Sequence, residues 1–256
     1  RSRARCSICT TVLSAWSGSI SVNISLAPVS CTVTTSPSGL QIIVDGGNYT
    51  APQTFTWTPG TSHTLSVSSP QNATSDTRYV YSSWSDGGAQ THTITVPSSS
   101  KTYTANFTTQ YTLTTSVGSS GGGKVTPSGT NWYNSGQSVQ ISATADAGYS
   151  FSNWSGDLSG TTSPASITMN EPKNVVANFT QNQYTLTVNI SPSGSGSVTK
   201  SPDKPTYVYG EQVTLTATAN PNYNFSSWSG SVTGTSNPVT LTINGNKTVT
   251  ANFSVI

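Results

Sequence analysis

The chain is short of charge. Lys and Arg number 10 and Asp and Glu number 8 among 256 residues, about 7% of the chain, whereas roughly a quarter of a soluble globular domain is usually charged. Arg1, Arg3 and Arg5 supply three of the ten basic residues, and the remaining seven are balanced by the eight acids. A nucleic-acid-binding protein normally carries a clustered basic surface. We therefore expect no nucleic acid among the partners.

Long apolar runs are also missing, and none is long enough to cross a bilayer. We accordingly expect no membrane span. No signal peptide is visible, which leaves open whether residue 1 is a natural mature terminus. The chain instead has about one-third Ser and Thr, with six Trp, eleven Tyr and six Phe. This combination predicts a folded, β-rich protein that is secreted or held on a cell surface.

Cysteine is confined to the N-terminal segment, at Cys6, Cys9 and Cys31. Cys6 and Cys9 have CxxC spacing, but a redox motif would accompany a βαβ pattern and a zinc site would need a second ligand pair. Neither is present. We expect a disulfide within this set, with one thiol left over, and no cofactor. Packing alone must then stabilise the rest of the chain.

The sequence of one short predicted strand occurs three times in the chain. A Trp-Ser pair precedes each copy by a similar distance: Trp84-Ser85, Trp154-Ser155 and Trp228-Ser229. The copies are Thr104-Ala-Asn-Phe-Thr108, Val176-Ala-Asn-Phe-Thr180 and Thr250-Ala-Asn-Phe-Ser254. Self-similarity of this kind is the mark of a repeat protein. We divide the chain into an N-terminal segment, 1–30, and three repeats: 31–109, 110–181 and 182–256.

Period-2 alternation predicts strands throughout the repeats. Leu186, Val188 and Ile190 share one face of a strand, and Val249, Ala251 and Phe253 share a face of another. No window has helical periodicity. We predict an all-β fold, a tandem array of three small β-sandwich or β-grasp-like domains. We also predict that the last two strands of each repeat form a hairpin, with Asn244-Gly245 as the turn in repeat three.

The orientation of the recurring Trp is left open by the pattern. Tyr149 and Phe151 share a strand face, and Trp154 has the opposite parity. A β-bulge would reset the parity and make the Trp a core residue. Otherwise Trp84, Trp154 and Trp228 face away from the core, where they could stack on sugar rings.

The repeats resemble a known family. Gly148-Tyr-Ser-Phe-Ser-Asn-Trp-Ser-Gly156, followed by a strand ending in Val-Ala-Asn-Phe-Thr, is similar to the internalin B-repeat family and its divergent bacterial relatives. The resemblance covers repeats two and three fully. The first half of repeat one, with Thr34–Gly46 and Trp57–His63, is more similar to the PEGA-type surface domain. The resemblance implies a stalk or adhesive role in extracellular surface proteins and provides no catalytic residues.

An extra strand is predicted outside the repeats. Ile20, Val22, Ile24 and Leu26 alternate without interruption. Such a strand needs a sheet to join, and two hypotheses fit. It pairs within repeat one or is the remnant of a preceding repeat, or it completes the sheet of a neighbouring molecule by strand donation. The second hypothesis gives a filament, because a head-to-tail contact need not close.

Candidates for catalysis and metal binding are few. The two histidines, His63 and His92, lie among Ser and Thr, and no G-x-S-x-G motif is present. The eight carboxylates do not cluster as in a calcium loop, and Asp45-Gly46 reads as a hairpin turn. We expect no enzyme activity and no metal site.

Glycosylation is the modification that the sequence suggests. Among the Asn-x-Ser/Thr sequons, Asn106, Asn178 and Asn252 point outward if the Ala and Phe beside them point inward. Asn153 and Asn224 are further candidates.

The sequence therefore predicts an extracellular structural protein that forms a stalk, filament or surface layer, polymerising through N-terminal strand donation. Its partners would be copies of itself or other surface proteins, and glycans. The alternative is a carbohydrate-binding or adhesive module of a larger secreted protein.

Overall fold

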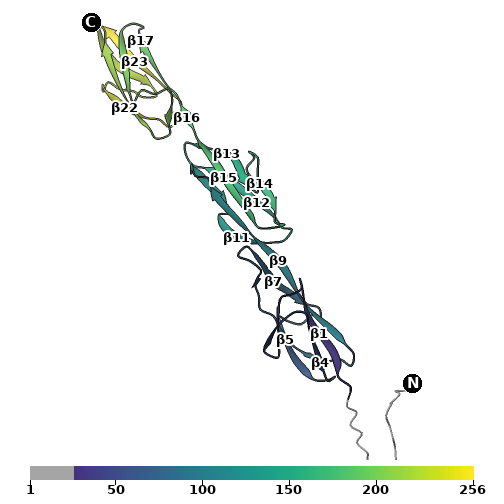
Figure 1. Ribbon diagram of the computed structural model, residues 1–256. Helices are drawn as coiled ribbons and strands as arrows, with labels where there is room; N and C mark the ends of the chain where they lie inside the picture. The colour runs from purple at the N-terminus through teal and green to yellow at the C-terminus, as the bar shows by residue number, and fades with distance from the viewer. Residues whose placement is uncertain (1–25) are drawn as a thin grey trace, which may run out of the picture. The chain divides into compact units, whose positions relative to one another are not determined.

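The computed structural model describes residues 26–256. These residues form strands and loops and contain no helix, so none that could cross a membrane is found among them. The predicted all-β fold is confirmed. Contacts divide the chain into two compact units, residues 26–67 with 83–105, and residues 68–82 with 106–256. Figure 1 shows the strands of each.

Repeat three shows the domain architecture in its simplest form. Three strands make one sheet, in the order β17-β23-β21, and three make a second, in the order β18-β20-β22, while β16 and β19 pair separately. The strands are β16 (Gln183–Tyr184), β17 (Leu186–Ser191), β18 (Gly196–Ser201), β19 (Tyr207–Val208), β20 (Gln212–Ala219), β21 (Tyr223–Gly230), β22 (Val239–Thr242) and β23 (Lys247–Val255).

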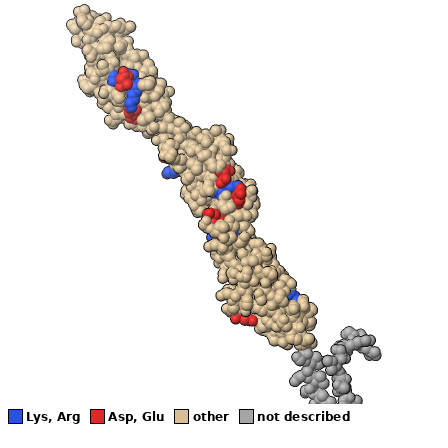
Figure 2. Space-filling view, in the orientation of Figure 1, with Lys and Arg blue, Asp and Glu red and all other residues tan. Residues whose placement is uncertain are grey.

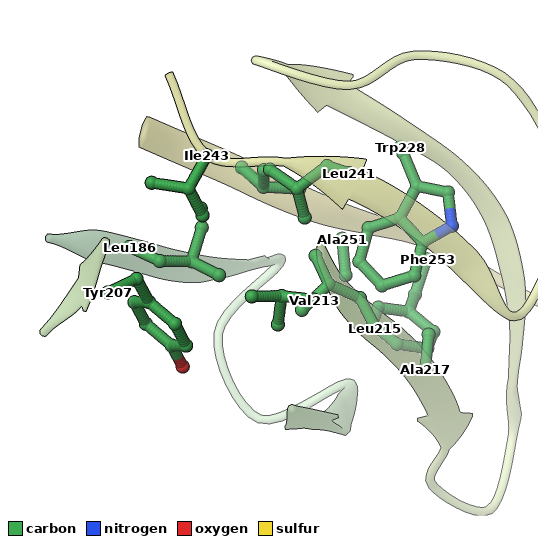
Figure 3. Close-up of a cluster of buried hydrophobic side chains, with 11 residues drawn as sticks. Leu186, Tyr207, Val213, Leu215, Ala217, Trp228, Leu241, Ile243, Ala251 and Phe253 are labelled. Atoms are coloured by element: carbon green, nitrogen blue, oxygen red, sulfur yellow. The ribbon is translucent and has the colours of Figure 1, made fainter. Parts of the chain in front are cut away.

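The core of repeat three lies between these two sheets. Val213 and Leu215 from β20 meet Val249 and Ala251 from β23, and all four are completely buried. Figure 3 shows the Trp228 indole beside this cluster. Because both sheets direct one face into the same core, the domain is a small β-sandwich.

Repeat two has the same order. One sheet runs β11-β9-β15-β13 and the other β10-β12-β14. Its own core contains Leu113, Ile141, Trp154 and Ala177. The strands are β10 (Gly123–Thr126), β11 (Gly129–Asn134), β12 (Ser138–Ala145), β13 (Tyr149–Gly156), β14 (Ala165–Thr168) and β15 (Lys173–Gln181).

Repeat one follows the same plan with additional pairing. One set of strands has the order β4-β1-β9-β7, with β6 on β7, and the other β3-β2-β5-β8. Asp45 and Gly46 both have positive φ and close the β2–β3 hairpin, as predicted. The strands are β1 (Val29–Ser36), β2 (Gln41–Val44), β3 (Gly47–Thr50), β4 (Gln53–Trp57), β5 (Ser62–Ser66), β6 (Gln71–Asn72), β7 (Thr77–Trp84), β8 (Thr91–Thr95) and β9 (Lys101–Val117).

In repeats two and three, the first and last strands lie side by side and run in the same direction. β9 pairs in parallel with β15, from Leu113 opposite Lys173 to Val117 opposite Ala177. β17 pairs in parallel with β23 over six residues. Because the two strands are parallel, the chain enters a repeat at one end of this pair and leaves at the other.

The parity of the Trp is resolved by a β-bulge. The register of β13 against β15 shifts between Phe151 and Asn153, and that of β21 against β23 shifts between Phe225 and Ser227. The extra residue turns Trp154 and Trp228 to the same side as Phe151 and Phe225. In repeats two and three, a bulge therefore makes the Trp a core residue, which was the first of the two alternatives.

The predicted hairpin between the last two strands is wrong. β22 pairs with β20, whereas β23 pairs with β17 and β21. β14 and β8 likewise pair with β12 and β5 and not with the strands that follow them. The connection, including Asn244-Gly245, crosses from one sheet to the other. Alternation shows that both strands face a core, but two strands facing each other across that core have the same pattern as a hairpin.

Candidate functional site

The three recurring Trp side chains lie in the cores. Trp84, Trp154 and Trp228 are 3%, 2% and 2% exposed. Each indole Nε1 donates a hydrogen bond to a carbonyl oxygen of the following loop: Gln90 O at 3.1 Å, Thr162 O at 2.8 Å and Ser236 O at 2.9 Å. Buried indoles usually find such a partner. These rings present no free face on which a sugar could stack.

The candidate glycosylation sites differ in access. Asn178 and Asn252 are half-buried, and their Nδ2 atoms donate to serines of the neighbouring strand, to Ser155 Oγ at 2.9 Å and to Ser229 Oγ at 3.0 Å. Asn153 Nδ2 donates to the Trp154 carbonyl at 2.9 Å, and Asn106 is also half-buried. Asn224 is exposed. A glycan attaches to Nδ2, so Asn224 is the most accessible of the five.

The N-terminal predictions fall mainly outside the described residues. Ile20, Val22, Ile24, Cys6 and Cys9 all lie there. Leu26 is 49% exposed and precedes β1. Cys31, on β1, is completely buried, and its thiol is free among residues 26–256.

A polar hollow in repeat one was not predicted from the sequence. It has a volume of about 420 Å³ and is lined by the loop 86–88, by β8 and by the start of β9. Four ionisable side chains line it: Asp86, His92, Lys101 and Tyr103. They come from three segments far enough apart in the sequence that no short motif contains them.

His92 connects β8 to the loop that precedes it, in the wall of the hollow, through two hydrogen bonds. Its Nε2 lies 3.0 Å from Asp86 Oδ2, and its Nδ1 lies 2.8 Å from the Ala89 carbonyl oxygen. Both oxygens only accept, so both ring nitrogens must carry hydrogen for both bonds to form. The ring also packs so closely on Gly88 that a Cβ there would lie 2.3 Å from it.

The Asp86 carboxylate is stabilised in its charged form. Burial acts to raise its pKa, but hydrogen bonds from His92 and the Gly88 N–H, together with the charge of His92, outweigh burial and hold the pKa below its usual value. Asp86 and His92 are thus held together within the wall of the hollow, with 3.0 Å between Oδ2 and Nε2.

The second histidine has a similar setting elsewhere in repeat one. His63 Nδ1 lies 2.7 Å from Asp45 Oδ2, and Nε2 lies 3.1 Å from Thr61 Oγ1. The Thr61 hydroxyl donates to Thr58 O at 2.8 Å, so it accepts from His63. The Asp–His–Thr chain therefore does not activate Thr61 as a nucleophile, since His63 has no free lone pair facing it.

Within residues 26–256, no three His, Cys, Asp or Glu side chains lie close enough together to hold an ion. Charge is sparse at the surface as well, and Figure 2 shows only small groups of charged side chains on the visible face.

Comparison with known proteins identifies a family for repeats two and three. The family described as "Divergent InlB B-repeat domain" matches residues 112–183 and 186–256, which is more than half of the chain. No curated protein matches the chain. Among solved structures, "The Bacillus anthracis TIE protein" is 10% identical with a TM-score of 0.34, over 89% of this chain. The chain spans half the length of that structure. On the two family matches, the chain belongs to the divergent InlB B-repeat domain family, whose members are repeat modules of bacterial surface proteins.

Proposed function

We propose that the chain is a spacer of the bacterial surface that bears tension along its length. The observation that carries this proposal is the parallel pairing of the first and last strands in repeats two and three. A domain entered and left at opposite ends adds length each time it is repeated. Nothing in such an array needs catalytic residues.

The same pairing suits the domains to mechanical load. When the chain is pulled from both ends, β17 and β23 are drawn past each other along their own axes. The hydrogen bonds of six residue pairs, from Leu186–Lys247 to Ser191–Asn252, then share the force. Bonds loaded together resist more force than bonds that open one after another. Repeat two has five such pairs between β9 and β15.

Single-molecule force spectroscopy on the full chain tests the proposal. With handles at the two termini, we expect one unfolding event per repeat, each releasing about 25 nm for roughly 70–75 residues. The control tethers the same protein at Ser193 and the C-terminal residue. These positions follow the same end of the β17–β23 pair, so pulling peels the strands apart. Repeat three should then unfold at clearly lower force. Equal forces in the two geometries would contradict a load-bearing role.

Polymerisation by strand donation is a second, finer proposal for the N-terminal segment. Repeat one already has a first strand, β1, which pairs with β4 and β9. The strand order of repeat one is therefore complete without residues 19–26, and this supports a role for them in pairing with another molecule. Negative-stain electron microscopy of the full chain and of a chain lacking residues 1–27 tests this. Fibres from the full chain alone support donation, and fibres from both, or from neither, count against it.

A further inference from the structure

Repeats two and three serve as internal controls for the hollow in repeat one. His92 lies opposite Leu65 in the β5–β8 pair, at the place where Ala165 lies opposite Ile141 and Val239 opposite Leu215. Tyr103 stands two residues before the recurring Ala, where the other repeats have Val175 and Val249. Asp86 stands two residues after the Trp, where they have Gly156 and Gly230. Repeat one thus replaces small or apolar residues with functional groups at three places that meet in one hollow.

The Tyr103 hydroxyl is the least expected of these groups. The side chain is 1% exposed and lines the hollow, and no hydrogen bond within residues 26–256 reaches its hydroxyl. No buried side-chain oxygen or nitrogen in this part of the chain lacks a partner, so the hydroxyl must open into the hollow, where it can donate to a ligand. Burial raises the Tyr103 pKa, and the negative charge of Asp86 acts in the same direction, so the hydroxyl stays protonated and able to donate.

Lys101 supplies a second donor and a positive charge. Its Nζ lies 4.9 Å from the centre of the Tyr103 ring. No carboxylate lies within ion-pair distance of it in the described part of the chain, whereas Lys173, at the same place in repeat two, pairs with Glu171 at 2.5 Å. Among the side chains that line the hollow, Lys101 is therefore a cation without a carboxylate partner. A cation beside an unused hydroxyl donor fits a carboxylate.

The third side of the hollow is the free edge of a sheet. Within residues 26–256, β8 is the last strand of its sheet and pairs with β5 alone. Val96 exchanges backbone hydrogen bonds with the β5 side, through Val96 N to Thr61 O and Gly60 N to Val96 O. Backbone groups alternate along an antiparallel strand, so those of Thr93 and Thr95 point away from β5, along the side that lines the hollow. Free edges of this kind accept an additional strand.

We propose that repeat one binds an extended peptide that pairs with the free edge of β8 and places an Asp or Glu carboxylate against Lys101 and Tyr103. The backbone pairing provides general affinity, and the carboxylate contact provides selectivity. Repeats two and three have the same edge but lack these side chains, so they bind this peptide more weakly. This inference does not depend on the spacer function.

The test is an NMR titration of the ¹⁵N-labelled full chain with acetyl-Thr-Val-Glu-Val-Thr-amide. We expect shift changes at residues 86–95 and 101–103. Replacing the peptide's Glu by Gln, or the protein's Lys101→Met or Tyr103→Phe, should each weaken binding by about tenfold. Lys173→Met and Lys247→Met are matched controls at the same strand position, and neither should change the affinity. Far-ultraviolet circular dichroism of each variant checks that it is folded.

Three outcomes would overturn the inference. The Glu and Gln peptides could bind equally, which would remove the carboxylate contact. Lys101→Met could behave like Lys173→Met, which would place binding elsewhere. Sodium glucuronate could shift the same residues while the peptide does not, which would make the hollow a site for an acidic sugar and not for a peptide strand.

Discussion

At the scale of single residues, the recurring motifs are explained by packing. The Trp-Ser-Gly of repeats two and three ends in Gly156 and Gly230, whose φ values are +88° and +94°. A Cβ at either glycine would lie within 2.5 Å of a backbone carbonyl oxygen, that of Asn174 or Thr248. Only glycine combines this backbone conformation with such close approach. The Trp before it fills the core and satisfies a loop carbonyl.

The indole hydrogen bond can be separated from the indole's bulk. Trp228→Phe keeps most of the apolar volume but leaves the Ser236 carbonyl without its donor, so we expect a loss of about 1–3 kcal/mol in the free energy of unfolding. Trp228→Ala also creates a cavity and should cost about 3–5 kcal/mol. Urea unfolding of the full chain measures both. Equal losses for the two variants would mean that the hydrogen bond, and not the bulk of the ring, accounts for the effect.

Acid should lower the folding stability of repeat one, because it protonates Asp86. Its pKa is lowered in the folded state, so its contribution to stability is complete above the unfolded pKa, near 3.8, and is lost as the pH falls through the folded value. The pKa of Asp45, which lies beside His63, is also lowered in the folded state, so its contribution to stability is likewise lost as the pH falls. Asp86→Asn should therefore lower the stability of repeat one at pH 7 and flatten the fall of its stability as the pH drops below the unfolded pKa, near 3.8. A variant whose pH profile overlays that of the original chain would show that the pair contributes nothing.

At the scale of strands, alternation predicted most of the elements but not their partners. Leu186, Val188 and Ile190 correctly marked β17, and Val249, Ala251 and Phe253 marked β23. The hairpin between the last two strands was wrong because periodicity reports which face is buried and not which neighbour is hydrogen-bonded. The hollow was missed for another reason. His92 looked unremarkable among Thr residues, and only alignment of its strand with β14 and β22 shows it replacing Ala165 and Val239.

Two glycines at the start of a strand control the approach of the sheets. Gly123 opens β10 and Gly196 opens β18, and a Cβ on Gly196 would lie 2.5 Å from Thr218 O and 2.6 Å from the Phe253 ring. Gly196→Ala should cost about 1–3 kcal/mol, because the crowded atoms must move. Gly245→Ala is the matched control, since nothing lies within 4 Å of its Cβ and its φ is not positive. A control variant as unstable as Gly196→Ala would argue against crowding as the cause.

At the scale of the whole molecule, stability is divided among separate cores. The buried cluster of repeat two and that of repeat three have no residue in common. Repeat arrays of this kind are expected to open one domain at a time. Leu215→Ala, at a completely buried position, should lower the stability of repeat three by about 2–5 kcal/mol. Hydrogen exchange should then quicken in residues 186–256 and stay unchanged in 123–179. Faster exchange in both would show that the two cores unfold together.

The break between β15 and β17 has a consequence for how the spacing between repeats two and three can change. The buried Ala177 and Leu186 are nine residues apart, and the strand is interrupted at Asn182. Side chains alternate between the two sides of an unbroken strand, so an odd interval would place these two residues on opposite sides. Because the strand is broken there, we expect that one residue can be gained or lost at this junction without turning either strand over.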